Sequence, residues 1–266
     1  MAGVLRAVLQ ASTFGALPTL VLCATVASNA AASPTSCSCG IPSEVLSPSL
    51  ERPVPVDARI RIRHPAGAKS GGFLLRLHRG GEIATTVQRT LGGPDDPVEV
   101  VELVPSAPLP VGARFEVGEK HPDRRPSLLV FATFVTQAKA TTDALAPVVD
   151  TPGKLVAFPL PATPIDSCGQ RPPRLQLHGL RAHDPGRTEA ALLVAFWRAD
   201  ASGVIDEKKP PIVFATLGDP IDFSGREMCG QAAFVLPERG PAEIGWAIVD
   251  ERGNRSSLRR EKIVLP

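Results

Sequence analysis

The sequence predicts an all-β protein with two antiparallel β-sandwich domains in tandem after a signal peptide. Short segments alternate apolar and polar residues with a period of two, and Gly and Pro separate these segments. No window has helical periodicity, and 28 Pro among 266 residues disfavour long helices, because Pro lacks the amide N–H that a helix interior needs. Hydrophobic residues make up 43% of the chain, which is enough for globular cores.

Residues 1–32 are typical of a signal peptide. Arg6 is the only charge before and within an apolar stretch, and residues 30–32, all Ala, are the small residues that a signal peptidase requires. We expect cleavage after residue 32, no transmembrane segment in the mature chain, and export to the periplasm, the cell surface or the medium. An uncleaved N-terminal anchor is the alternative. A lipid anchor is not expected, because the residues before Cys23 and Cys37 fit lipoprotein processing poorly.

Four cysteines remain after the signal peptide is removed: Cys37, Cys39, Cys168 and Cys229. An even number in an exported chain favours disulfide bonds over free thiols. We expect a bridge between Cys168 and Cys229, both in the second half, which would stabilise that domain by roughly 2–4 kcal/mol. Cys37 and Cys39, in the N-terminal segment 33–40, then pair with each other, stay free or bond to a partner.

The first domain, residues 41–138, is expected to be a sandwich of short strands. In residues 56–63 apolar and charged residues alternate without a break, the pattern of an antiparallel strand with one face on the core and the other in solvent. The remaining strands are expected at residues 73–77, 83–87, 98–104, 114–117 and 128–136, the last as a buried closing strand.

The second domain is expected at residues 174–266, after a Pro-rich connection. Residues 139–173 hold seven Pro and no sustained alternation, so we expect the interdomain connection and an irregular first strand there. Trp197 and Trp246 alternate with small or apolar residues and are expected to anchor the core. The other strands are expected at residues 175–180, 191–198, 212–215, 232–236, 243–249 and 258–265.

The first domain resembles a known family in its second half. Residues 103–117 read Leu-Val-Pro, then Pro-Leu-Pro-Val-Gly-Ala-Arg-Phe-Glu-Val, and residues 131–136 read Phe-Ala-Thr-Phe-Val-Thr. With the opening segment 53–62, this resembles the bacterial Ig-like domain of S-layer and other envelope proteins over about residues 41–138. Phe115 stands where that family usually has Tyr, so the resemblance implies that its ring packs without the hydrogen bond of a hydroxyl.

The end of the second domain is similar to fibronectin type III or Ig-like modules. Residues 246–256 contain Ala-Ile-Val-Asp-Glu-Arg-Gly-Asn-Arg-Ser, the hairpin common in such modules. Gly253 and Asn254 tolerate a positive φ and can turn one strand into the last. The two resemblances together imply two Ig-like sandwiches in tandem.

No motif points to catalysis, a cofactor or a metal centre. The five histidines lack metal-site spacing, the serine-hydrolase elbow is absent, and residues 68–72 lack the first Gly of a phosphate loop. Residues 92–97 and 218–222 each place two carboxylates in a Gly/Pro loop. We expect solvated turns there, with calcium as the alternative, since calcium wants six to eight oxygen ligands.

The composition narrows the function to a few classes. A net charge of +2 gives no electrostatic signature of nucleic-acid binding. We expect a non-catalytic envelope protein with a structural, spacer or adhesive role, and other envelope proteins or surface polysaccharide as partners. A carbohydrate- or protein-binding accessory module is the first alternative, although the chain has no Tyr, a residue enriched at recognition surfaces. A secreted hydrolase is the second alternative.

Overall fold

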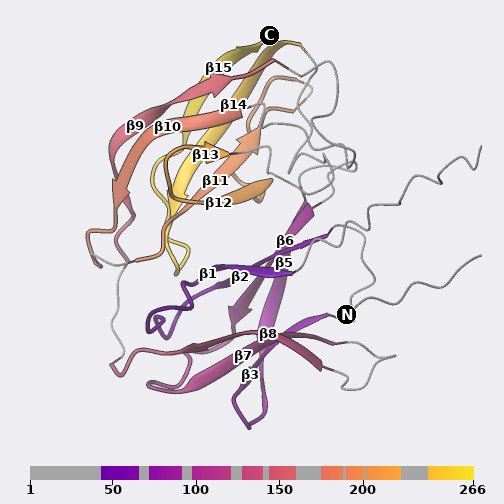
Figure 1. Ribbon diagram of the computed structural model, residues 1–266, viewed down its shortest axis with the longest axis vertical. Coiled ribbons are helices and arrows are strands. Elements are labelled where there is room, and N and C mark those ends of the chain that lie inside the picture. Colours follow the sequence, from indigo (N-terminus) through magenta and orange to yellow (C-terminus); the bar gives the residue numbers. More distant parts are fainter. Residues whose placement is uncertain are drawn as a thin grey trace, which may run out of the picture. The chain divides into compact units, whose positions relative to one another are not determined.

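The regular elements of the chain are β-strands throughout the part that the structure describes. This computed structural model describes residues 43–65, 72–91, 98–120, 128–139, 144–159, 175–187, 190–200, 202–222 and 239–266. The strands form four antiparallel sheets, which confirms the expected fold class of two β-sandwich domains (Figure 1). No helix in the described ranges is long and apolar enough to cross a membrane.

The first sandwich contains two four-stranded sheets. Phe115 and Phe134 of one sheet stack with ring centroids 5.4 Å apart, and they pack on Ile60, Ile62 and Leu103 of the other. Phe115 is fully buried, so its ring packs as the Ig-like resemblance implied. One sheet has the order β1 (Glu44–Ser47), β2 (Ile60–Pro65), β6 (Val98–Pro105), β5 (Thr85–Leu91); the other has the order β4 (Glu82–Ile83), β3 (Phe73–Leu77), β7 (Arg114–Lys120), β8 (Leu128–Val135).

Two strands of the first sandwich differ from the sequence-based expectation. β2 begins at Ile60, because the Ala58 N–H bonds to the Pro55 carbonyl 3.2 Å away and turns the chain there. β8 is an edge strand rather than a buried one, and Leu129 is 51% exposed. Only its inward residues, such as Phe134, reach the core, since one face of an edge strand has nothing packed on it here.

The second sandwich contains a three-stranded and a four-stranded sheet. Its core surrounds the fully buried Trp246, as expected for a core anchor. β9 falls inside the Pro-rich stretch 139–173 and pairs with β10, whereas the strand expected at residues 232–236 lies outside the described residues. The sheets have the orders β13 (Ile221–Asp222), β10 (Leu175–His183), β9 (Val148–Ala157) and β12 (Val213–Thr216), β11 (Leu193–Arg198), β14 (Gly240–Val249), β15 (Arg259–Leu265).

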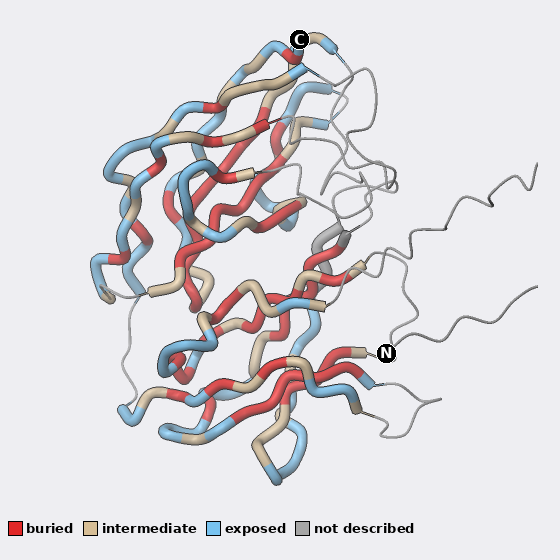
Figure 2. The backbone as a smooth tube through the Cα atoms, viewed as in Figure 1, coloured by how far each residue is buried: buried red, intermediate tan, exposed pale blue. Residues whose placement is uncertain are grey.

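The four-stranded sheet of the second sandwich is buried on both faces along β11. Val194 and Phe196 point into the core of the sandwich. Leu193, Ala195 and Trp197 point the other way and are also buried, so the central strands are red in Figure 2. The outer face forms what we call the shared cluster, because it includes Val100 from β6 of the first sandwich; its buried members are Val100, Leu193, Ala195, Trp197, Ile205, Phe214, Ala247 and Val249.

Candidate functional site

A buried arginine lies where the first sandwich meets the shared cluster. Arg61 of β2 is 1% exposed, and its Nε donates a 2.8 Å hydrogen bond to Oε2 of Glu102 on β6. Its NH1 group donates a 2.9 Å hydrogen bond to the carbonyl oxygen of Asp250, and its guanidinium lies 5.2 Å from the ring centroid of Phe214. Burial lowers the pKa of Arg61 and Glu102 raises it, yet a guanidinium stays charged at neutral pH.

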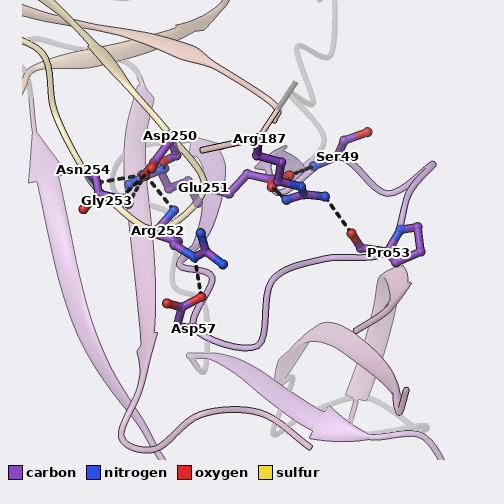
Figure 3. A network of polar contacts seen from close by, with 10 residues as sticks. Ser49, Pro53, Asp57, Arg187, Asp250, Glu251, Arg252, Gly253 and Asn254 are labelled. Atoms are coloured by element: carbon purple, nitrogen blue, oxygen red, sulfur yellow. Dashed lines mark hydrogen bonds and ion pairs between the residues drawn. The ribbon is translucent and has the colours of Figure 1, made fainter. Parts of the chain in front are cut away.

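The carboxylate of Asp250 organises the loop that receives Arg61. Its Oδ1 accepts hydrogen bonds from the backbone N–H groups of Arg252, Gly253 and Asn254 at 2.9, 2.7 and 2.8 Å (Figure 3). Gly253 has φ +94°, as expected for this turn, whereas Asn254 does not take a positive φ. The backbone carbonyl of Asp250 accepts a hydrogen bond from the Gly253 N–H at 3.3 Å as well as the one from Arg61, so the same residue closes the loop and receives the guanidinium.

Glu251, the next residue, binds the first sandwich through its side chain and its backbone. Its carboxylate is 3% exposed, pairs with Arg187 and accepts a 3.3 Å hydrogen bond from the Ser49 N–H. Its carbonyl oxygen accepts a 2.8 Å hydrogen bond from the Arg59 N–H. Arg187 also donates a 2.8 Å hydrogen bond to the Pro53 carbonyl. Burial raises the pKa of Glu251, and the charge of Arg187 opposes that rise.

An ion pair at the rim completes this set of contacts. Arg252 Nε donates a 2.7 Å hydrogen bond to Oδ1 of Asp57, whose side chain is 42% exposed (Figure 3). We call the contacts of Arg61, Asp250, Glu251, Arg187 and Arg252 the boundary network. It joins segments of the first sandwich to two loops of the second, and it lies next to the apolar shared cluster.

A cleft of about 220 Å³ opens beside this network. Residues of both sandwiches line it, and the basic ones outnumber the acidic ones by five to one. Its lining comprises Arg59, Arg61, Gln88, Glu102, Trp197, Lys208, Lys209, Pro210, Pro211, Phe214, Val249, Gly253 and Arg255. The arrangement offers positive charge beside aromatic and proline surface, which suits a small anionic molecule better than a neutral one.

The boundary network and the cleft, as the described residues form them, contain none of the residues predicted as sites from the sequence. Cys37, Cys39, Cys168 and Cys229 are outside the described residues, as is the acidic loop 92–97. In the other acidic loop, Oδ1 of Asp219 accepts a hydrogen bond from the backbone of residue 179, and Oδ1 of Asp222 accepts one from the side chain of residue 176. Within the described ranges no three His, Cys, Asp or Glu side chains gather as a metal site would need.

The boundary network itself was missed by the sequence analysis. Alternation in residues 56–63 predicted that Arg61 faces solvent, and the structure buries it against the second sandwich. The sequence carried one signal, the unbroken apolar run Ala-Ala-Leu-Leu-Val-Ala-Phe-Trp at residues 190–197. Such a run in an antiparallel sheet indicates that both faces of the strand are covered.

Comparisons with known proteins assign this chain to no family. No family model matches the chain, and no curated protein matches it. Among solved structures, the chain is similar to the fibronectin(III)-like modules of CbhA from Clostridium thermocellum. The match covers 84% of this chain and 94% of that chain, with 12% sequence identity and a TM-score of 0.24. The class of protein is therefore the one that its own strand pairing defines, an all-β protein built of antiparallel β-sandwiches.

Proposed function

We propose that this chain is an exported, non-catalytic envelope protein whose two β-sandwiches act together as one rigid structural or spacer module. The observation that carries the proposal is the junction between the sandwiches. There, one sheet face of the second sandwich packs in the shared cluster, and the boundary network fixes the adjoining loops.

The chemistry of this junction supports rigidity. Domains in one chain move relative to each other by default unless their interface is large and apolar. Here apolar side chains of β11, β12 and β14 are buried with Val100, and the charge of Arg61 is withdrawn from water and compensated by Glu102. Separating the sandwiches would expose that apolar face and break the hydrogen bond from Arg61 to the Asp250 carbonyl, so the free energy of the junction favours one fixed arrangement.

The role that follows is mechanical rather than chemical. A spacer or a scaffold in the envelope must keep its length and orientation under load, and a junction fixed by buried apolar contacts and hydrogen bonds provides that. Partners on this proposal are other envelope proteins or surface polysaccharide, with no nucleic acid and no cofactor.

Fractionation of the native host with intact-mass analysis tests the proposal. We expect the protein outside the cytoplasm, with a mass that corresponds to a chain starting at residue 33. Crosslinking in intact cells should then recover one envelope component in a stoichiometric ratio. A full-length chain in the cytoplasmic fraction would contradict export, and an exported chain that crosslinks to nothing in the envelope would contradict the structural role.

A further inference from the structure

The lining of the cleft beside the boundary network carries more positive than negative charge. Of its lining residues, Arg59 and Arg61 belong to the first sandwich, and Lys208, Lys209 and Arg255 belong to the second. Among the described residues, Glu102 is the one acidic member of the lining. Cations from two separate segments therefore face a common space of about 220 Å³.

Glu102 is already engaged by the two arginines of its own sandwich. Its Oε1 lies 3.1 Å from Arg59 NH1, and its Oε2 lies 2.8 Å from Arg61 Nε. Outside the lining, Glu207 pairs with Arg255 at 3.4 Å and with Arg260 at 3.0 Å. These carboxylates leave the cleft with a surplus of positive charge, which attracts anions.

The loop that carries the two lysines is held in place by its backbone. Trp197 Nε1 donates a 2.9 Å hydrogen bond to the carbonyl of Lys209. The Lys208 N–H donates a 3.0 Å hydrogen bond to Oδ1 of Asp206. Both lysines are exposed, so their ammonium groups are accessible while the loop is fixed. A fixed loop lowers the entropic cost of binding a ligand.

The rest of the lining is mostly apolar, with Gln88 as a polar member. Pro210 and Pro211 follow the lysines, and the rings of Trp197 and Phe214 lie behind them in the shared cluster. Arg255 lies over the Trp197 ring, 5.3 Å from its centroid, which orients its guanidinium at the same cleft. Apolar surface next to converging cations suits a ligand with a compact body and one anionic group.

We propose that this cleft binds an acidic saccharide unit, that is, a sugar-sized ring that carries a carboxylate or a phosphate. The anionic group lies among Lys208, Lys209 and Arg255, and the sugar ring lies on Pro210 and Pro211, which are exposed and half-buried. The rings of Trp197 and Phe214 are buried beneath the guanidinium groups of Arg255 and Arg61, so they support this surface from below. Bound there, the anion also reduces the repulsion between the cations of the two sandwiches. This inference goes beyond the structural role and does not depend on export, but it rests on the fixed arrangement of the two sandwiches, because both of them line the cleft.

Calorimetric titration of the full chain at low salt with four probes tests the proposal: glucuronate, glucose 6-phosphate, glucose and inorganic phosphate. We expect glucuronate or glucose 6-phosphate to bind at least roughly tenfold more tightly than both glucose and inorganic phosphate. The tighter of the two identifies the anionic group as a carboxylate or a phosphate. Equal binding of glucose, equal binding of inorganic phosphate, or no binding of either acidic sugar would overturn the proposal.

A matched pair of double variants locates the site. Lys208→Gln with Lys209→Gln removes two positive charges from the cleft and leaves the backbone hydrogen bonds of the loop in place. Lys154→Gln with Lys262→Gln removes two charges from exposed positions on β9 and β15 outside the lining. We expect the first pair to weaken binding roughly tenfold or more and the second to leave it unchanged. Equal weakening by both pairs would show a response to total charge and would overturn the site.

Discussion

Arg61 and Asp250 meet at the boundary between the two sandwiches, where a buried guanidinium donates a 2.9 Å hydrogen bond to a backbone carbonyl. The two residues are 189 positions apart in the chain. The contact works because each partner is compensated elsewhere: Glu102 balances the charge of Arg61, and the side chain of Asp250 closes its own loop. Arg61 thereby links the charged strand of one sandwich to the final hairpin of the other.

Replacing Arg61 should destabilise the protein strongly. Arg61→Ala leaves a void and leaves Glu102, which is 7% exposed, with the more exposed Arg59 as its partner. Removing one partner of a buried ion pair lowers the free energy of unfolding by about 3–5 kcal/mol. Urea unfolding measures the free energy of unfolding. The control is Arg63→Ala on the same strand, whose ion pair with Glu44 is more exposed and should contribute about 1 kcal/mol or less. Equal losses in both variants would contradict the role assigned to Arg61.

The buried carboxyl of Glu251 should make stability depend on pH. Burial raises its pKa in the folded protein above the ordinary value of 4.5. Between the unfolded and folded pKa values the folded state binds more protons, so the contribution of Glu251 to stability falls as the pH rises through that window.

Glu251→Gln isolates this contribution, because it keeps the size of the side chain and removes its titration. Denaturation midpoints of both proteins from about pH 4 to pH 7 provide the measurement. We expect the stability of the unmodified protein, relative to the variant, to fall as the pH rises above 4.5. Parallel pH profiles, or the opposite slope, would contradict a raised pKa.

Gly253 should be harder to replace than a comparable turn glycine. A Cβ at Gly253, where φ is +94°, would lie 2.5 Å from Nε of Arg59, so Arg59 would have to move away from Glu102. Gly203→Ala is the matched control, since φ there is +78° and nothing lies within 4 Å of the added Cβ. Both variants should lose about 1 kcal/mol from backbone strain.

Gly253→Ala should lose up to about 1 kcal/mol more than the control, the value of a partly exposed ion pair. The extra loss should disappear when both glycine variants are made in an Arg59→Ala background, as thermal or urea unfolding can measure. An extra loss that persists without Arg59 would show that a different contact is responsible.

The two sandwiches should unfold as one cooperative unit. Trp246 lies in the core of the second sandwich, whereas Trp197 lies in the shared cluster, so the fluorescence of Trp246 in a Trp197→Phe background reports on the second sandwich. Ile62→Ala opens a void in the core of the first sandwich and should cost about 2–5 kcal/mol. If the junction couples the sandwiches, this substitution lowers the urea midpoint of tryptophan fluorescence.

Val264→Ala on β15 is the control, because Val264 is 74% exposed and its loss should change stability by about 0.5 kcal/mol or less. An unchanged fluorescence midpoint in Ile62→Ala, together with loss of structure in the first sandwich, would show that the two sandwiches unfold independently.

The sequence predicts the strands well and their surroundings less well. Period-two alternation located the strands that contain Phe115 and Trp246, because a strand places every second side chain in the core whatever lies outside. The same alternation placed Arg61 in solvent, and this was wrong, because a local pattern does not contain the contacts of a strand with a distant domain. The position of Lys208 and Lys209 at a cleft depends on the same distant contacts.

The double-sided burial of β11 limits how this protein can be taken apart. Many β-sandwich domains can be joined in new orders, because the outer surface of each domain is polar and exposed to solvent. If the second sandwich were expressed by itself, Leu193, Ala195 and Phe214 would form an exposed apolar patch that favours aggregation. Neither recombination of domains nor truncation in the laboratory should therefore yield the second sandwich as an independently soluble domain. The two sandwiches should function, and be inherited, only as a pair.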